Sequence, residues 1–141
     1  MNKMRKTTKT CLHLLLPLAA LLVLTPKMVK ADGPDGAAIY ANTCAACHQP
    51  DGSGLATSYP PLMGQAVVAG DPDVVIKIVL LGPAKVLPAD RPKYTGQMPP
   101  MTNLSDAKIA AVITYIRDKF GKGASAVDED EVTKVKASLA Q

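Results

Sequence analysis

The sequence predicts an all-α domain of about four helices joined by long loops rich in proline and glycine. Apolar residues recur at intervals of three and four along several segments, which is the pattern of amphipathic helices. No segment alternates apolar and polar residues as a half-buried strand does. With 141 residues, 48% of them hydrophobic and 20% charged, the chain has the composition of one globular domain.

Residues 1–31 have the pattern of a secretory signal peptide, with a basic start, an apolar stretch over residues 11–24 and, in Val29-Lys30-Ala31, small or β-branched residues at the positions that a signal peptidase inspects. An uncleaved membrane anchor is the alternative. A membrane-spanning helix needs roughly twenty apolar residues, whereas this stretch is shorter and is interrupted by Pro17. We therefore expect cleavage after Ala31, a mature domain over residues 32–141, and a periplasmic protein without stable membrane insertion.

Removal of this leader reverses the sign of the net charge. The whole chain has 16 Lys and Arg against 12 Asp and Glu, for a net charge of +4. The leader holds 6 of the basic residues and none of the acidic ones, so the mature domain has 10 basic and 12 acidic residues and a net charge of −2. Because it also has no basic stripe with interleaved aromatic residues, we expect no nucleic-acid partner.

The first helix of the domain is expected over residues 35–47, where apolar residues fall on one face. An irregular loop is expected over residues 49–70, because glycine and proline recur there. Cys44 and Cys47 are therefore expected at the end of a helix, next to a long loop.

The second helix has a clear beginning in the sequence. Asp71 can cap its free amide groups, and Pro72 suits the first helical position, where no donor is needed. The helix should end near residues 81–83, and an irregular stretch over residues 83–103 follows. Because chain entropy opposes the ordering of so long a loop by itself, we expect a bound cofactor to organise it.

Two further helices complete the domain. Ser105 is expected to cap a strongly amphipathic helix that Gly121 ends. A last helix is expected over residues 128–140, where an acidic start and later lysines complement the helix dipole.

The motif with the most chemical information consists of Cys44, Cys47 and the directly following His48. Cysteines three apart at a helix end point their sulfurs the same way, so each can add to one vinyl group of a porphyrin whose iron the histidine binds. A structural disulfide, half of a zinc site and a thiol-disulfide exchange motif are the alternatives. Zinc would need a fourth protein ligand that no second Cys or His of the mature chain supplies, and exchange enzymes set the motif in a βαβ unit. The motif therefore predicts one haem c attached through two thioethers.

The sixth iron ligand cannot be a second histidine, because His48 is the only histidine after the leader. The methionine candidates are Met63, Met98 and Met101. Met98 is favoured as the ligand, because Gly96 lets the backbone pass close to the ring and the two prolines after Met98 stiffen the strap. Met101 is the alternative, and otherwise Met63 and Met101 are expected to fill the core.

The mature chain resembles class I cytochromes c, in the branch of small bacterial periplasmic carriers. Only the haem motif is specific by itself, and the order and spacing of the other segments add to it. The segments that carry the resemblance are residues 44–48, Tyr59-Pro60-Pro61-Leu62, Gly96-Gln97-Met98-Pro99-Pro100, Leu104-Ser105-Asp106 and Thr114-Tyr115-Ile116-Arg117. The resemblance implies the cytochrome c fold, in which the helices wrap around one covalently attached haem.

The resemblance also implies two structural roles. In such proteins a proline carbonyl after the haem motif accepts the ring N–H of the histidine, which falls on Pro60 here, with Pro61 as the alternative. A glycine with an aromatic residue four positions later lets the first helix cross a late helix closely, and Gly36, Tyr40 and Tyr115 occupy these positions.

The functional hypothesis is a monomeric one-electron carrier, not an enzyme, that shuttles electrons between a dehydrogenase or membrane complex and a terminal acceptor through transient contacts with redox proteins. The alternatives are an electron-transfer subunit of a larger oxidoreductase and a haem peroxidase. The lack of a distal histidine counts against the peroxidase. The residues expected to enclose the haem are Ile76, Val79, Leu80, Leu104, Ile109 and Ile113.

A basic patch is a further hypothesis. Four cations lie between the haem motif and the Met98 strap, namely Lys77, Lys85, Arg91 and Lys93. They are expected either to steer an acidic partner or to be ordinary solvated side chains.

Overall fold

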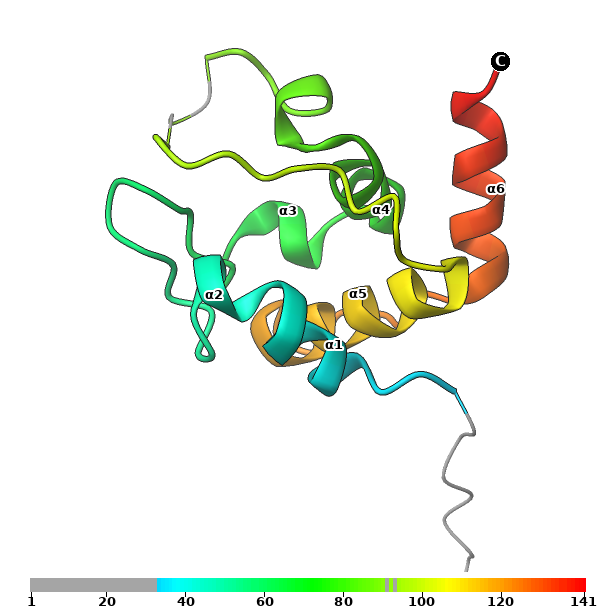
Figure 1. Cartoon of the computed structure of the whole chain (residues 1–141), viewed down its shortest axis with the longest axis horizontal. Helices are drawn as coiled ribbons and strands as arrows, with labels where there is room; N and C mark the ends of the chain where they lie inside the picture. The colour runs from blue at the N-terminus through cyan, green and yellow to red at the C-terminus, as the bar shows by residue number, and fades with distance from the viewer. Residues whose placement is uncertain (1–32, 91, 93) are drawn as a thin grey trace, which may run out of the picture. The chain divides into compact units, whose positions relative to one another are not determined.

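The computed structural model describes residues 33–90, 92 and 94–141 (Figure 1). The chain divides into two units, Met1–Lys30 and Ala31–Gln141, and only the second is described. The expected signal peptide and its cleavage site lie outside the described residues, as do Arg91 and Lys93 of the expected basic patch.

The described part of the chain is all-α, as predicted. Its elements are α1 (Gly36–Thr43), α2 (Ala45–His48), α3 (Ala66–Ala69), α4 (Pro72–Leu81), the short 3₁₀ turn η1 (Pro83–Lys85), α5 (Asp106–Phe120) and α6 (Glu129–Leu139). An isolated bridge between Leu55 and Tyr59 is the nearest approach to a strand pair within these residues.

Side-chain caps fix the helix starts, and they confirm the predicted beginnings of α4, α5 and α6. The Asp71 carboxylate accepts a hydrogen bond of 2.9 Å from a first-turn amide of α4. The Ser105 hydroxyl accepts one of 3.3 Å from α5. Asp128 and Glu131 form a reciprocal capping box at α6. Each cap satisfies amide donors that a helix start leaves unpaired.

The predicted first helix is broken at Cys44, which corrects the expectation of one helix over residues 35–47. α1 ends at Thr43 and α2 begins at Ala45, with Cys44 between them at φ −109° and ψ −36°. The Cys44 carbonyl accepts from the amides of both Cys47 (3.1 Å) and His48 (2.9 Å). This shared acceptor tightens the turn that carries the motif.

The two long loops contain short helices that the sequence did not predict. α3 lies within the loop expected over residues 49–70, and η1 lies within the one expected over residues 83–103. Four residues give too few positions to show a helical period, and no side chain caps the start of α3. Packing against the neighbouring helices α4 and α5 therefore decides where α3 forms.

The helix crossing is the contact between α1 and α5 around Gly36, Tyr40, Tyr115 and Phe120 (Figure 1). A side-chain carbon at Gly36 would overlap the carbonyl oxygen of Ala111, so the close approach requires glycine. The ring of Tyr40 lies 5.4 Å from Tyr115 and 5.3 Å from Phe120, in tilted arrangements. The structure thus confirms the close crossing that the resemblance implied.

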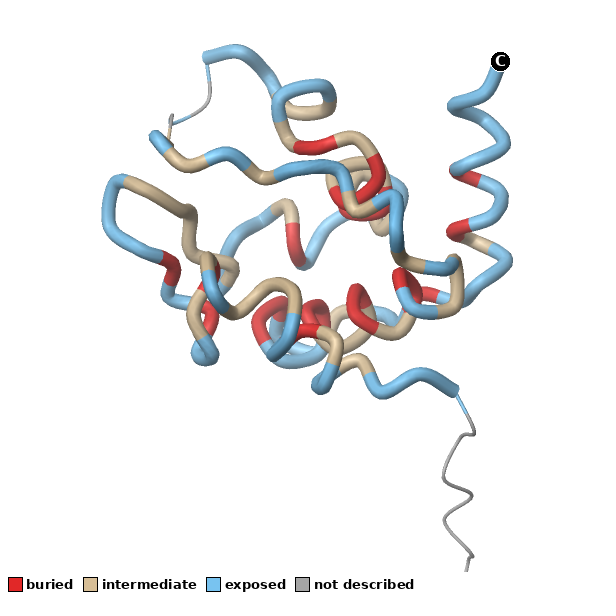
Figure 2. Tube along the Cα trace, viewed as in Figure 1, coloured by how far each residue is buried: buried red, intermediate tan, exposed pale blue. Residues whose placement is uncertain are grey.

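The core lies between the helices and is mostly aliphatic. Figure 2 shows buried residues on the facing sides of α4, α5 and α6, while much of the connecting loops is exposed. Ile76, Ile109, Ile113 and Val132 have no exposed surface. This rigid block supports α4 and α5, which form two sides of the cavity described below.

The loop wall is formed by residues 55–62 and 94–104. Main-chain hydrogen bonds join its two segments, from Thr95 to the Thr57 carbonyl (3.1 Å) and from Gly96 to the Ser58 carbonyl (2.8 Å). The amide of Met101 donates to the Val79 carbonyl (2.9 Å), which anchors the wall to α4. A few backbone contacts therefore join the long loops to each other and to α4.

No helix in the part of the chain that the structure describes is both long and apolar enough to cross a membrane.

Candidate cofactor site

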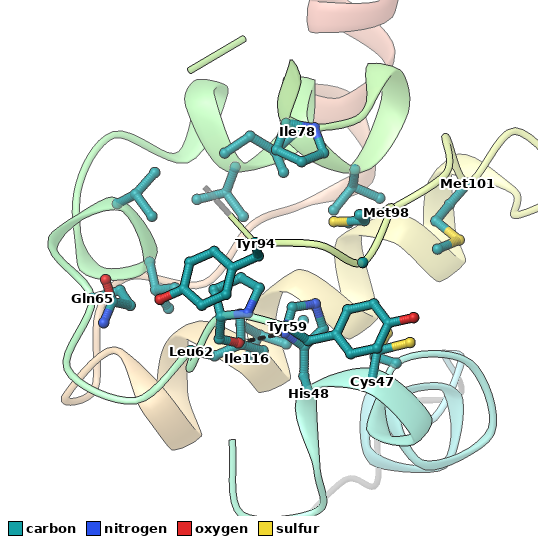
Figure 3. A pocket seen from close by; sticks show the side chains of 18 of the residues that line it. Cys47, His48, Tyr59, Leu62, Gln65, Ile78, Tyr94, Met98, Met101 and Ile116 are labelled. Carbon is teal, nitrogen blue, oxygen red and sulfur yellow. Dashed lines mark hydrogen bonds between the residues drawn. The ribbon is translucent and has the colours of Figure 1, made fainter. Parts of the chain in front are cut away.

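A cavity of about 450 Å³ lies between α2, α4, α5 and the loop wall (Figure 3). Its volume falls in the range of roughly 300–1,000 Å³ typical of small-molecule and cofactor sites. Its lining is mostly apolar, and two of the residues expected to enclose the haem, Val79 and Leu104, contribute to it.

Four of the residues expected to enclose the haem do not line the cavity. Ile76, Leu80, Ile109 and Ile113 are buried in the core behind it. Residues one to three positions away on the same helices take their places in the lining, namely Val75, Ile78, Val112 and Ile116. The periodicity identified the buried side of each helix but could not divide that side between core and cavity.

Cys44 and Cys47 lie half-buried at the edge of the cavity, and both are free thiols. Burial raises the pKa of the Cys44 thiol to about 11, and the neighbouring Cys47 adds to the shift. A thiol-disulfide exchange enzyme needs a thiolate at neutral pH, so this pKa counts against that function. Among the described residues, no three Cys, His, Asp or Glu side chains form a cluster that could hold a metal ion.

His48 is buried, and its ring is oriented by the backbone of the loop. Its Nδ1 lies 3.0 Å from the carbonyl oxygen of Pro60, the proline favoured over Pro61 by the resemblance (Figure 3). A carbonyl oxygen can only accept, so Nδ1 carries the proton and Nε2 keeps its lone pair. Burial lowers the pKa of His48, with the Pro60 hydrogen bond opposing the shift. The imidazole is therefore held neutral, in the form that binds metals.

Two backbone contacts fix the chain around His48. Its carbonyl accepts from the amide of Gly54 (3.0 Å). The next carbonyl, that of Gln49, accepts from the Tyr40 hydroxyl (2.6 Å). Burial raises the pKa of Tyr40 to about 12, so this hydroxyl stays protonated and keeps donating. The helix crossing thus extends directly to the residue after His48.

Of the three methionines considered, Met98 and Met101 line the cavity and Met63 does not. Figure 3 shows the sulfur of Met98 across the cavity from His48, with Met101 toward the edge of the view. Met63 is 55% exposed, which corrects the expectation that it fills the core. Met101 packs against the core as expected.

Gly96 is required by a contact that the sequence did not predict. A side-chain carbon there would overlap the ring of Tyr59 and lie 2.6 Å from the carbonyl oxygen of Ser58. The two segments of the loop wall can therefore pair only with glycine at this position. The pairing sets the course of the strap toward Met98.

Polar side chains also line the cavity, and the sequence assigned none of them a role there. Tyr59, Gln65, Tyr94 and Gln97 all contribute to the lining, and Figure 3 shows the polar ends of Gln65 and Tyr94 on the same side of it. They can donate hydrogen bonds to acceptors of a bound cofactor. Their positions in irregular loops give no periodic signal that could have identified them.

The fold and the site together define a c-type haem protein. Two cysteines and a neutral, oriented histidine at the edge of an apolar cavity provide the chemistry that covalent haem attachment requires, so the residues present fit haem c.

Comparison with known proteins identifies the family. The cytochrome c family profile matches residues 34–119. Cytochrome c-552 of Thermus thermophilus is 36% identical over 112 residues, which cover 73% of this chain and 85% of that protein. The chain belongs to the cytochrome c family, carries covalently attached haem c and functions in electron transfer.

Subunits of dehydrogenases are also similar to the chain. The gluconate 2-dehydrogenase cytochrome c subunit of Pantoea cypripedii is 38% identical over 99 residues, covering 67% of this chain and 22% of that subunit. The cytochrome c subunit of the alcohol dehydrogenase (quinone) of Gluconobacter oxydans is 32% identical over 109 residues, covering 75% and 23%. The chain therefore spans only about a quarter of these larger subunits.

Proposed function

We propose that this chain is a periplasmic one-electron carrier, not a catalyst, in which Cys44 and Cys47 form the two thioethers and His48 and Met98 are the axial iron ligands. The observation that carries the proposal is the pair formed by His48 and Met98. The imidazole, oriented by Pro60, faces the cavity from α2, and the thioether of Met98 faces it from the loop wall.

When bound, haem c supplies an iron that takes up one electron from a reduced donor and passes it to an oxidised acceptor. The residues of the chain hold its two ligands in place and exclude water. Pro60 keeps the proton on Nδ1 of His48, and Pro99 and Pro100 limit the movement of Met98. A site that keeps both iron ligands fixed needs little structural rearrangement when the iron gains or loses an electron.

Axial ligation by Met98 is tested by absorption spectroscopy of the haem-loaded protein. The ferric protein should show the far-red sulfur-to-iron band, and Met98→Ala should abolish the band and open the iron to carbon monoxide. Met101→Ala is the matched control, because Met101 also lines the cavity, and it should keep the band. Loss of the band in Met101→Ala with its retention in Met98→Ala would assign the ligand to Met101 instead.

The proposed location and processing follow from residues 1–31. We infer that this segment is a cleaved signal peptide and that the mature protein covers residues 32–141. Intact mass of the protein purified from periplasm tests both cleavage and cofactor, because the mass should equal residues 32–141 plus one haem. A mass that includes residues 1–31 would contradict the cleavage.

Two kinds of partner are compatible with the family. We propose a free monomeric carrier that contacts redox proteins transiently, since the chain covers 85% of the cytochrome c-552 that it resembles. A subunit of a dehydrogenase complex is the second candidate, favoured by the similarity to dehydrogenase cytochrome subunits. Salt-resistant co-purification with a large partner would favour the subunit, and elution as a monomer would favour the carrier.

The basic patch remains a prediction. Of its two described members, Lys85 is exposed and Lys77 is half-buried. If these lysines steer an acidic partner, the association rate with that partner should fall as ionic strength rises. A rate that does not change with salt would leave them as solvated side chains.

A further inference from the structure

Arg117 on α5 is the largest fully buried side chain among the described residues, at 2% exposure. Its Nε donates to the Ser125 carbonyl (2.8 Å) and its Nη2 to the Ser125 hydroxyl (3.0 Å). Its Nη1 donates to the carbonyls of Val68 (3.0 Å) and Gly70 (2.8 Å). One guanidinium thus joins α5, the end of α3 and the segment that leads to α6.

None of these four acceptors carries a charge. Within the described residues the one ion pair joins Lys136 to Asp106, and no carboxylate pairs with Arg117. The hydrogen bonds satisfy the donors of the guanidinium, but dipoles of neutral groups disperse its charge without cancelling it. Because water does not screen a buried charge as it screens an exposed one, the field of Arg117 extends further into the protein.

The charge lies directly behind the cavity lining. Ile116, the residue before Arg117, lines the cavity, and so does Val68, whose carbonyl accepts from the guanidinium. α3 is short and has no side-chain cap, so the bonds from Arg117 hold the end of this part of the lining. The same side chain therefore provides both a charge and a support next to the bound cofactor.

We propose that Arg117 is a positioning residue that raises the reduction potential of the haem and holds α3 against the cavity. Reduction adds one electron and lowers the positive charge at the iron by one. A nearby uncompensated cation therefore favours the reduced state. Removing or neutralising this cation should lower the potential, whereas a purely structural role would not make the potential depend on the charge.

A charge inserted opposite Arg117 tests the proposal without removing the arginine. Ser125 is exposed, and its hydroxyl contacts the guanidinium, so Ser125→Asp should place a carboxylate against the buried cation. Ala126→Asp is the matched control, because residue 126 is also exposed and the variant adds the same charge one position further along. Redox titration of the haem-loaded protein should show a lower midpoint potential for Ser125→Asp than for Ala126→Asp. Equal potentials in the two variants would overturn the proposal.

Substitutions of the arginine separate its charge from its hydrogen bonds. Arg117→Met should lower the midpoint potential relative to wild type. Arg117→Lys, which retains the positive charge, should lower it much less. Both variants should increase amide hydrogen exchange in α3. The control is Lys119→Met, an exposed cation on the same helix, whose effect should be smaller and should disappear at high salt. An unchanged potential in Arg117→Met, or an equal loss in Arg117→Lys, would overturn the role of the charge. If Arg117→Met does not fold, the Ser125→Asp comparison still decides.

Discussion

The helix crossing and the loop wall support the same cavity by different means. In the helix crossing, side chains of α1 and α5 pack directly, with aromatic rings 5.3 to 6.1 Å apart and a glycine at the closest approach. In the loop wall, a few main-chain hydrogen bonds join segments that are distant in the sequence. The crossing buries its own apolar surface, whereas the loop wall turns apolar side chains toward the cavity.

The difference indicates how each region depends on the cofactor. Side-chain packing in the crossing is complete without any further group, so this region should be stable by itself. The loop wall gains its apolar contacts only when the cavity is filled, because chain entropy opposes the ordering of long loops. We therefore expect loss of haem to disorder the loop wall first and the helix crossing last.

The largest effect should follow from preventing haem attachment in the double variant Cys44→Ala, Cys47→Ala. A cavity of about 450 Å³, left unfilled at about 24 cal/mol per Å³, would cost about 11 kcal/mol. This is on the order of the whole stability of a domain, which is about 5–15 kcal/mol. We expect far-UV circular dichroism to retain helix and near-UV dichroism to be reduced, because Tyr59 and Tyr94 of the loop wall lose their fixed surroundings while the rings of the helix crossing keep theirs. Amide exchange should be faster in the loop wall than in the helix crossing, and equal protection of the two regions would contradict the comparison.

The second effect addresses the helix crossing. Gly36→Ala places a side-chain carbon against the Ala111 carbonyl, a backbone atom that cannot rotate away. The overlap should force α1 and α5 apart and lower the free energy of unfolding by about 1–3 kcal/mol. Denaturant unfolding of the haem-loaded protein measures it. Gly33→Ala is the control, because nothing lies within 4 Å of that position. Equal stability of the two variants would show that the crossing does not need its glycine.

A comparable change in the loop wall should have a smaller and more local effect. Gly96→Ala would overlap Tyr59, whose ring can move, and the Ser58 carbonyl, which cannot. We expect a loss of about 1–2 kcal/mol, and loss of the far-red sulfur-to-iron band at a lower denaturant concentration than global unfolding. Thr95→Ala, at the exposed neighbouring position, should leave the band unchanged. Simultaneous loss of the band and of the helices in Gly96→Ala would mean that the loop wall unfolds only with the rest of the domain.

The smallest effect concerns the ion pair between α5 and α6. This pair takes no part in the helix crossing or the loop wall. The Lys136 ammonium contacts the Asp106 carboxylate at 2.6 Å, and Lys136 is 51% exposed. Asp106→Asn should therefore reduce stability by only about 0.5 kcal/mol. A double-mutant cycle with Lys136→Met isolates the contribution of the pair.

The pH dependence of that contribution has a definite sign. The hydrogen bond from Lys136 lowers the pKa of Asp106 below its usual value of 3.8. A carboxyl whose pKa is lower in the folded state stabilises the fold above its unfolded pKa, and this stabilisation is lost as the pH falls through the folded pKa. The difference between wild type and Asp106→Asn should be constant near neutral pH and should vanish in acid below pH 3.8. A difference that grows in acid would contradict this origin.

The sequence predicted the elements whose signals are local. Asp71, Ser105 and Gly121 mark helix ends that a single side chain or glycine determines. The crossing of Gly36 and Tyr40 with Tyr115 was implied by the resemblance to class I cytochromes c and not by a local signal. The break at Cys44, the short α3 and the contact of Gly96 with Tyr59 were not predicted. The short α3 and the contact of Gly96 with Tyr59 depend on residues far apart in the chain, which periodicity and capping rules do not report. At Cys44 no glycine or proline marks the break.

The residues of the site also divide into those with a local sequence signal and those that only the tertiary structure reveals. Residues in the attachment motif could be identified because their spacing is itself the chemical requirement. Arg117 lies in a segment that carries the family resemblance, but its sequence neighbours do not reveal that it is buried among neutral oxygens. Burial of a cation is a property of the tertiary structure and becomes visible only there.

The placement of the tyrosines gives this molecule a built-in optical reporter. The chain has no tryptophan and 4 tyrosines. Tyr40 and Tyr115 contact each other in the helix crossing, whereas Tyr59 and Tyr94 belong to the loop wall and line the cavity. We expect a haem bound in the cavity to quench the emission of each pair by energy transfer, and the emission to return as that pair moves away. Replacing one pair by phenylalanine would leave a fluorescence signal that follows the opening of a single region in real time.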